Sequence, residues 1–507
     1  MSRRLHAITL LAVAACSPQR RRTPDDTLVL AIETTMNTAD PRYALTNYDA
    51  KLAHLICPGL TSVDTPTDEP RLDLADKIEH VDPLTVDVTL RDARFSDGSP
   101  VTADDVARTY ASVLDPKCDS VSHANISDRY TSVEARGDRV VRFHLVQPLG
   151  TLMTDLEFGI LSFHGAPPGE CRPKLVGAGA YVLRELDSYH ALLDASPYAR
   201  ERPKLPHVEI KFVKDAAARI LMLVGGSADL LQNSARLDLI DDIALRPRVK
   251  VSTGASVLLT YLMMNNEDPV LRDLRVREAI ALAIDRPALV TAKFEGRAVL
   301  ATGLLPPTHW AYNPDVPRWN RDLPRAERLL DEAGVPRGTD GVRLHLVYKT
   351  SADAFRVTIA RLIADQLADV GIDVEVRAFE PATAFADIKK GNFQLASMQT
   401  APITDPDFYF FYFNSSRIPD AKDPDAGNRW RYRNPDVDRL TALGRRETDP
   451  AKRKAIYDEV QRLVARDLPI IPLWHEDNVV LSNVDVQGYA IIPNAGLSGL
   501  AAATKGK

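Results

Sequence analysis

The sequence predicts an α/β protein of two lobes, the first of which carries a small extra α+β subdomain. Amphipathic helices alternate with short strands between residues 270 and 470, which is the pattern of a sheet covered by helices. Mixed β structure dominates before that region and returns briefly after it. A chain of 507 residues, with 45% hydrophobic and 26% charged residues, is long enough for several globular units.

The N-terminus has the features of an export signal. Arg3 and Arg4 precede an apolar stretch that is too short to span a bilayer as a stable helix. The stretch ends in VAAC, which resembles a bacterial lipobox, so we expect residues 1–15 to be a signal peptide and Cys16 to carry a lipid. Residues 16–27 would then be a lipid-anchored tether. An ordinary secretory signal with a coincidental cysteine is the alternative.

A first strand is expected at residues 28–32, and a small α+β unit follows over residues 58–176. Alternating apolar residues predict strands at 85–90 and 138–145. Between them, residues 95–116 read FSDGSPVTADDVARTYASVLDP, an Asp-Gly turn followed by a helix with a Thr-x-x-Asp capping box. The apolar face of this helix is formed by Val106, Tyr110, Val113 and Leu114.

The second half of the chain alternates between helices and strands. Residues 258–265, LLTYLMMN, predict a strand that leaves the first lobe. Amphipathic helices are expected at 275–286, at 359–370 and from Pro450 onward, and the second of these leads through a glycine into an alternating strand. Residues 468–474, LPIIPLW, predict the extended segment that returns to the first lobe.

Five segments, in order, resemble the extracytoplasmic solute-binding proteins of family 5, which supply peptides or nickel to ABC importers. The segments are residues 95–116, GAGAY at 177–181, RVREAIALAIDR at 275–286, ATGLLPPTHWAY at 301–312 and QTAPITDPDFYFFYFN at 399–414. The resemblance implies a periplasmic-binding-protein-like fold of type II, cluster C. It implies that residues 28–57, 177–264 and 475–507 form lobe 1, that 58–176 form its extra subdomain, and that 265–474 form lobe 2.

The resemblance also implies a ligand cleft between the lobes, with the 399–414 segment as its main candidate. That segment contains Asp405, Asp407, Tyr409 and Tyr412, and aromatic residues with a few charges suit a partly apolar pocket. In peptide-binding members, an aspartate just before the Asp-Pro pair receives the ligand's ammonium group, whereas this chain has Pro402 there. Asp405 or Asp407 could take over that role, or the ligand could lack an amine. Asp405 could equally be a turn former.

The other candidate ligand-binding residues are chosen by position. Thr35, Met36 and Asn37 follow the first strand, and ligands bind beyond the carboxyl ends of strands in open α/β sheets. Asn265 ends LLTYLMMN, and Trp430 is the last candidate, although it could instead belong to the core of lobe 2. The crossing strands near residues 261–265 and 474–478 are expected to act as hinges.

Three cysteines follow Cys16. Cys118 and Cys171 have polar, loop-like surroundings, so we expect them to form a disulfide, which an extracytoplasmic location allows. Cys57 lies in an apolar, helix-like run and is expected to be a buried thiol. The spacing of the cysteines predicts no zinc or redox site.

We expect no enzyme, catalytic residue, cofactor or metal site. GGSAD at residues 225–229 lacks the second glycine of a nucleophile elbow, and the chain has no HExxH motif. A net charge of −6 without a concentrated basic face also argues against nucleic-acid binding.

The resemblance implies a monomeric, substrate-binding lipoprotein. It would capture a peptide or peptide-like solute between two hinged lobes and deliver it to an ABC permease and its ATPase. It would lie outside the cytoplasm, anchored to a bacterial membrane in the periplasm or at the outer cell surface. Two alternatives stay open: a ligand-binding sensor without a transport role, and a binder of a non-peptide solute such as a metal chelate or a sugar.

Overall fold

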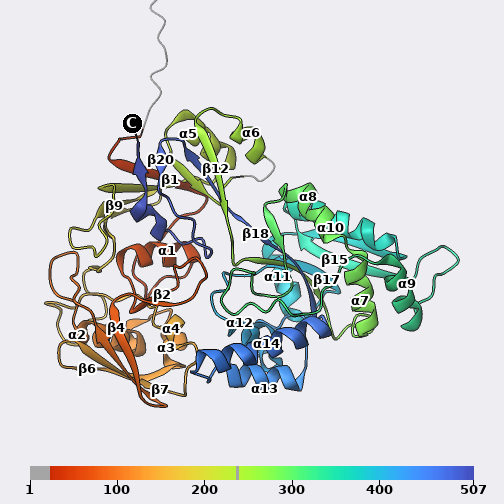
Figure 1. Cartoon of the computed structure of the whole chain (residues 1–507), viewed down its shortest axis with the longest axis horizontal. Coiled ribbons are helices and arrows are strands. Elements are labelled where there is room, and N and C mark those ends of the chain that lie inside the picture. The colour runs from red at the N-terminus through yellow and green to blue at the C-terminus, as the bar shows by residue number, and fades with distance from the viewer. Residues whose placement is uncertain (1–22, 236–238, 507) are drawn as a thin grey trace, which may run out of the picture.

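The computed structural model describes residues 23–235 and 239–506, which form two lobes and a subdomain (Figure 1). The predicted signal peptide and Cys16 lie outside this range. Residues 23–27 of the predicted tether pack against lobe 1 instead, because Thr23 donates a hydrogen bond to Asp229 and Lys505 donates to the Thr27 carbonyl. Among the helices in the described ranges, none has the length and apolar character needed to cross a membrane.

Lobe 1 is built on a mixed sheet that the described residues form from seven strands, in the order β12-β19-β11-β1-β10-β9-β8. Strand β1 is as predicted: Leu28 and Leu30 pack into one core, and Val29 and Ala31 pack into another on the opposite face. The strands are β1 (Thr27–Ile32), β8 (Tyr181–Leu186), β9 (His190–Ala195), β10 (His207–Phe212), β11 (Leu230–Gln232), β12 (Val249–Gly254) and β19 (Asn478–Asn483); the helices are α1 (Asn47–Ile56), α5 (Ala216–Gly225) and α6 (Ile240–Ala244), and a short pair, β20 (Val486–Gln487) and β21 (Thr504–Lys505), follows.

The subdomain has the predicted α+β form. Its antiparallel sheet has the order β4-β5-β7-β6, and α2 covers it with Val106, Tyr110 and Val113 fully buried. Thr102 and Asp105 form the predicted capping box of α2. The elements are β2 (Thr61–Ser62), β3 (Arg71–Leu72), β4 (Ala75–Asp82), β5 (Thr85–Leu90), α2 (Ala103–Leu114), α3 (His123–Ser127), β6 (Tyr130–Arg136), β7 (Val140–Leu145) and α4 (Leu152–Asp155).

Lobe 2 holds the sheet β14-β18-β13-β17-β15-β16, with helices packed on it. The predicted helix–glycine–strand unit is confirmed as α10 and β16. The strands are β13 (Leu259–Met264), β14 (Ala298–Leu300), β15 (Leu344–Ser351), β16 (Ile372–Phe379), β17 (Leu395–Gln399) and β18 (Ile470–Glu476); the helices are α7 (Leu274–Ala283), α8 (Arg286–Phe294), α9 (Leu323–Glu332), α10 (Ala354–Ala368), α11 (Pro381–Lys390), α12 (Phe408–Phe413), α13 (Pro435–Gly444) and α14 (Pro450–Asp467).

The chain crosses between the two sheets through residues 255–258 and through Asp477. The prediction that residues up to 264 belong to lobe 1 is therefore wrong for β13, which pairs with β17 and β18 in lobe 2. The hinge expected at 261–265 is also misplaced, because those residues form a buried strand and end in a buried turn. An apolar strand has the same pattern in either sheet, so only its pairing partners decide to which lobe it belongs. The second predicted hinge, 474–478, contains the crossing at Asp477.

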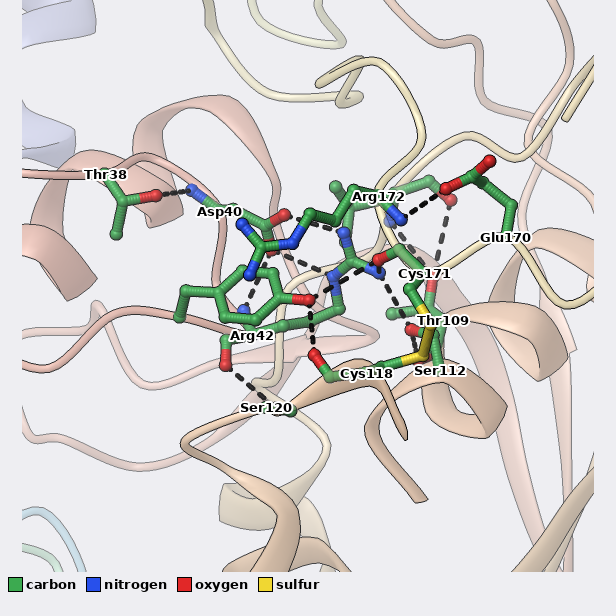
Figure 2. A network of polar contacts seen from close by, with 12 residues as sticks. Thr38, Asp40, Arg42, Thr109, Ser112, Cys118, Ser120, Glu170, Cys171 and Arg172 are labelled. Carbon is green, nitrogen blue, oxygen red and sulfur yellow. Dashed lines mark hydrogen bonds and ion pairs between the residues drawn. A yellow bond between two sulfur atoms is a disulfide. The ribbon is translucent and has the colours of Figure 1, made fainter. Parts of the chain in front are cut away.

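A buried arginine joins lobe 1 to the subdomain (Figure 2). Arg42 is 0% exposed and pairs with Asp40 at 2.7 Å. Its Nη1 also donates hydrogen bonds to Ser112 Oγ at the end of α2, at 2.9 Å, and to the Cys171 carbonyl, at 2.8 Å. Cys171 forms a disulfide with Cys118, the pairing that the sequence predicts, whereas Cys57 is free and buried. The disulfide therefore fixes the loop that covers Arg42.

Removing this disulfide should destabilise the protein. The bond closes a loop with a sequence separation of 53 residues, for which the chain-entropy model gives about 4 kcal/mol. We expect the Cys118→Ala/Cys171→Ala double variant to unfold at a lower urea concentration than the oxidised wild type. Reductant should lower the urea midpoint of the wild type to that of the variant and leave the midpoint of the variant unchanged. Equal midpoints for the oxidised and reduced wild type would contradict this prediction.

A candidate ligand-binding cleft between the lobes

Three adjoining cavities form a cleft where the lobes and the subdomain meet. The central cavity, of about 490 Å³, is lined by α1, by the residues around α4 and by Pro402 and Thr404 of lobe 2. The crossover cavity, of about 340 Å³, lies beside Leu258 and Asp477, and the distal cavity, of about 510 Å³, lies between the subdomain and α12. The central cavity shares Lys51 and Pro402 with the crossover cavity and Thr404 with the distal cavity, so it adjoins both.

The subdomain contacts lobe 2 at the end of the cleft away from the crossings, where α13 and α14 approach α4 and β7 (Figure 1). The Gly150 N–H donates to the Arg445 carbonyl at 2.7 Å, and Arg446 Nε donates to Gln147 Oε1 at 3.0 Å. A Cβ at Gly150 would clash with the carbonyl oxygen of Glu447, so only glycine permits this approach. The cleft is thus bounded at both ends.

Helix α1 supplies a polar stripe to the cleft wall. Asn47, Lys51 and His54 lie at i, i+4 and i+7 and all line the central cavity, while Leu52 and Leu55 face the core of lobe 1. The sequence predicts an apolar, helix-like run around Cys57, and this prediction does not include the stripe. The spacing of the three polar residues is the signal that could have revealed it.

Lys51 and Glu33 place opposite charges in the crossover cavity. Burial lowers the pKa of Lys51 to about 8. Among the residues that the structure describes, no acceptor lies within hydrogen-bond distance of its ammonium group. Tyr48 donates a hydrogen bond to Glu33 Oε1 at 2.6 Å, and the buried Oε2 finds no partner in the described chain. The wall of the crossover cavity therefore carries the Lys51 ammonium group, which lies 5.0 Å from the centroid of the Tyr48 ring, and the Glu33 carboxylate of opposite charge.

The two predicted aspartates lie at the distal cavity, but each is paired with an arginine. Asp405 is 4% exposed, and its two oxygens accept from Arg453 at 2.6 and 3.0 Å. Thr154 of the subdomain also donates to Asp405, at 3.1 Å. Asp407 pairs with Arg445 at 3.2 Å and accepts a hydrogen bond from Tyr457 at 3.1 Å. Burial raises the pKa of Asp407 to about 6.

The predicted aromatic ligand contacts are core residues. The Tyr409 hydroxyl accepts a hydrogen bond from the Leu304 N–H at 3.2 Å, Tyr412 stacks on Trp430, and all three side chains belong to the buried core of lobe 2. The reason is that the segment forms α12, which turns one face inward. Its other face presents Phe408, Phe410 and Phe411 to the distal cavity.

The remaining predicted residues do not line the cleft cavities either. Met36 is a buried core residue, and the Asn37 N–H donates a hydrogen bond to Asp49, which forms the capping box of α1 with Thr46. Thr35 is partly buried and lies outside all three linings. The amide of Asn265 donates to the carbonyls of Gly391 and Phe393, which makes it a structural residue of lobe 2.

The comparisons with known proteins agree with this architecture. Residues 69–420 match the family model for bacterial extracellular solute-binding proteins, family 5 Middle. The chain belongs to this family. It is 26% identical, over 79% of each chain, to the probable di/tripeptide-binding protein 5 of Pseudomonas aeruginosa (strain UCBPP-PA14), and 26% identical, over 93% of each chain, to the glutathione-binding protein GsiB of Escherichia coli O1:K1 / APEC.

A solved structure has the same fold. The ABC transporter substrate-binding protein CtaP of Listeria monocytogenes superposes with a TM-score of 0.83 at 22% sequence identity, over 95% of this chain and 99% of that one. The fold is therefore that of the two-lobed periplasmic binding proteins. As a family 5 member, the chain is an extracytoplasmic solute-binding protein and not an enzyme. In this family 5 protein, Pro402 lines both the central and the crossover cavity and brings no charge to either.

Asp405→Asn and Asp407→Asn should affect stability in opposite ways at pH 7. Breaking the buried Asp405–Arg453 pair leaves an uncompensated guanidinium, at a cost of about 3–5 kcal/mol. Asp407 has a raised pKa, so the folded state holds a proton that the unfolded state has lost between about pH 4 and pH 6. Its contribution to stability therefore falls as the pH rises through that window.

We expect Asp407→Asn to gain stability relative to the wild type as the pH rises from 4 to 7, by roughly 1–3 kcal/mol. Asparagine can still accept the Tyr457 hydrogen bond. Urea denaturation at several pH values measures both variants. A stability difference between Asp407→Asn and the wild type that does not vary with pH would contradict the raised pKa.

Proposed function

We propose that the protein captures a peptide or peptide-like solute in the cleft and delivers it to an ABC permease and its ATPase. The observation that carries this proposal is the pair of opposite charges, on Lys51 and Glu33, in the wall of the crossover cavity. A short peptide carries an ammonium group and a carboxylate, so it complements both. Two relatives support the same class of solute, since one is a probable di/tripeptide-binding protein and the other a glutathione-binding protein.

The cleft suits such a solute in size and lining. Its cavities, of about 340 to 510 Å³ each, lie within the range of small-molecule sites. In this proposal Glu33 takes the role of the aspartate that Pro402 replaces, and it comes from lobe 1 instead of lobe 2. Of the residues predicted from the sequence, Asp405 and Asp407 stay in the proposal only as members of the distal wall.

The two lobes are proposed to open about their paired crossing strands and to close on the solute, which is a hinge motion. The contacts of Gly150 and Gln147 with Arg445 and Arg446 would then break on opening and form again on closure. We also propose that residues 58–176 are a subdomain of lobe 1, that Cys16 carries the lipid anchor, and that the protein acts as a monomer.

Thermal shift against a tripeptide library should identify ligands. A ligand at a hundred times its dissociation constant stabilises the folded state by about 2.7 kcal/mol. A melting point that rises with a sugar or with a metal chelate, and with no peptide, would contradict the peptide proposal without affecting the fold.

Each charge in the crossover cavity should recognise one peptide terminus. We expect Lys51→Met to weaken binding of a peptide with a free carboxylate by roughly 10- to 100-fold, since a charge-assisted hydrogen bond contributes about 1.5–3 kcal/mol. The same variant should bind the C-terminal amide as the wild type does. Glu33→Gln should likewise weaken binding of a peptide with a free amine and bind the N-acetylated peptide as the wild type does. Isothermal titration calorimetry measures these affinities, and Lys250→Met, in the exposed part of β12, is the control.

The pH dependence provides an independent check of Lys51. With an N-acetylated peptide, whose amine cannot titrate, affinity should fall as the pH rises through about 8, where Lys51 loses its charge. Lys51→Met should show no such fall. Equal pH profiles for the wild type and Lys51→Met would remove Lys51 from the site.

A further inference from the structure

Three side chains on the wall of the central cavity converge on one point. His54 comes from α1, Asp64 follows β2, and Glu157 follows α4. Asp64 Oδ2 lies 3.6 Å from His54 Nε2, and Glu157 Oε1 lies 4.0 Å from His54 Nδ1. Each of the three residues offers a ligand atom, and these atoms all lie within 4.8 Å of one another. One cation could therefore contact all three after small side-chain shifts.

Each carboxylate is held through one oxygen. Asp64 Oδ1 accepts a hydrogen bond from Asn494 Nδ2 at 2.9 Å, and Glu157 Oε1 accepts from the Val63 N–H at 3.2 Å. The Asp64 side chain is only 7% exposed, yet its Oδ2 has no hydrogen-bond partner within the described ranges. A buried carboxylate oxygen without a donor is costly. A positive ligand at this point would remove that cost.

A third carboxyl group is buried near Asp64 and Glu157. Asp68 is 0% exposed, and neither of its carboxyl oxygens has a hydrogen-bond partner in the part of the chain that is described. Its φ of 54° is in the left-handed region, which a non-glycine residue rarely adopts. Strained residues of this kind cluster at functional sites. The seam between lobe 1 and the subdomain therefore holds three carboxyl groups, those of Asp64, Glu157 and Asp68. The cations of Lys51 and Arg71 lie near Asp64.

We propose that His54, Asp64 and Glu157 bind a divalent first-row transition metal ion such as Zn²⁺. Imidazole suits these metals, whereas Ca²⁺ takes six to eight oxygen ligands. His54 and Glu157 are 23% and 29% exposed to the cavity, so the ion would have a coordination position open toward the cleft. The site does not depend on a peptide ligand. A proton on His54 would compete with the metal ion, because protonated His54 would form ion pairs with Asp64 and Glu157.

The test is a Zn²⁺ titration of the full chain, stripped of metal by a chelator, without any peptide. We expect saturable binding of one ion, weakened at least about 100-fold in His54→Gln and in Glu157→Gln. Glutamine at 157 can still accept the Val63 hydrogen bond, so this variant should keep the fold. His190→Gln is the matched control, because His190 with Glu185 and Asp187 forms a second, more exposed cluster.

Co²⁺ as a spectroscopic probe adds a readout that a structural role would not change. Its visible absorption should appear in the wild type and in His190→Gln, and it should be lost in His54→Gln. Absence of saturable binding in the wild type would overturn the proposal, and so would loss of binding in His190→Gln alone. Peptide titrations in the presence of chelator test the proposed function separately, so the failure of either proposal can be told from the failure of the other.

Discussion

The two crossing segments are held together by the strands on either side of them, and this pairing sets how the lobes are placed. In lobe 1, β12 pairs with β19, and in lobe 2, β13 pairs with β18, so the crossings run side by side as one ribbon. Asn478 ties the ribbon together: its amide donates to the Ala255 carbonyl at 2.8 Å, and its oxygen accepts from Asn233 at 2.7 Å. Because both crossings are short, the lobes must face each other across a cleft. Every cavity described above is a consequence of that geometry.

Buried arginines hold the parts of the molecule in register around the cleft. Arg42 joins lobe 1 to the disulfide loop of the subdomain, and Arg453 binds Asp405 where lobe 2 meets Thr154 of the subdomain. A guanidinium can satisfy several acceptors at once in a fixed geometry. It therefore suits seams where carbonyls and carboxylates from different elements meet away from water. Asp405 is an unsuitable partner for a ligand because Arg453 already donates hydrogen bonds to both of its oxygens.

Sequence reasoning succeeded where a local pattern decides the structure. The capping box at Thr102, the glycine stop after α10 and the alternation of β1 each depend on neighbours within one element. It failed where the decisive contact is distant. The segment 399–414 was expected to be a ligand loop because it holds aromatic and acidic residues, but as α12 it buries Tyr409 and Tyr412 against Trp430.

The family, the α/β class, the α+β subdomain and the pairing of Cys118 with Cys171 could all be predicted from the sequence, because they depend on motifs, on periodicity and on the local surroundings of single residues. Which residues line the cleft depends on the tertiary fold. β13 joins lobe 2 through partners more than 130 residues away. Lys51 and His54 reach the cleft on α1, and Glu33 reaches it directly after β1. The physical reason is that burial and charge pairing are properties of neighbours in space, and these neighbours come from all three parts of the molecule.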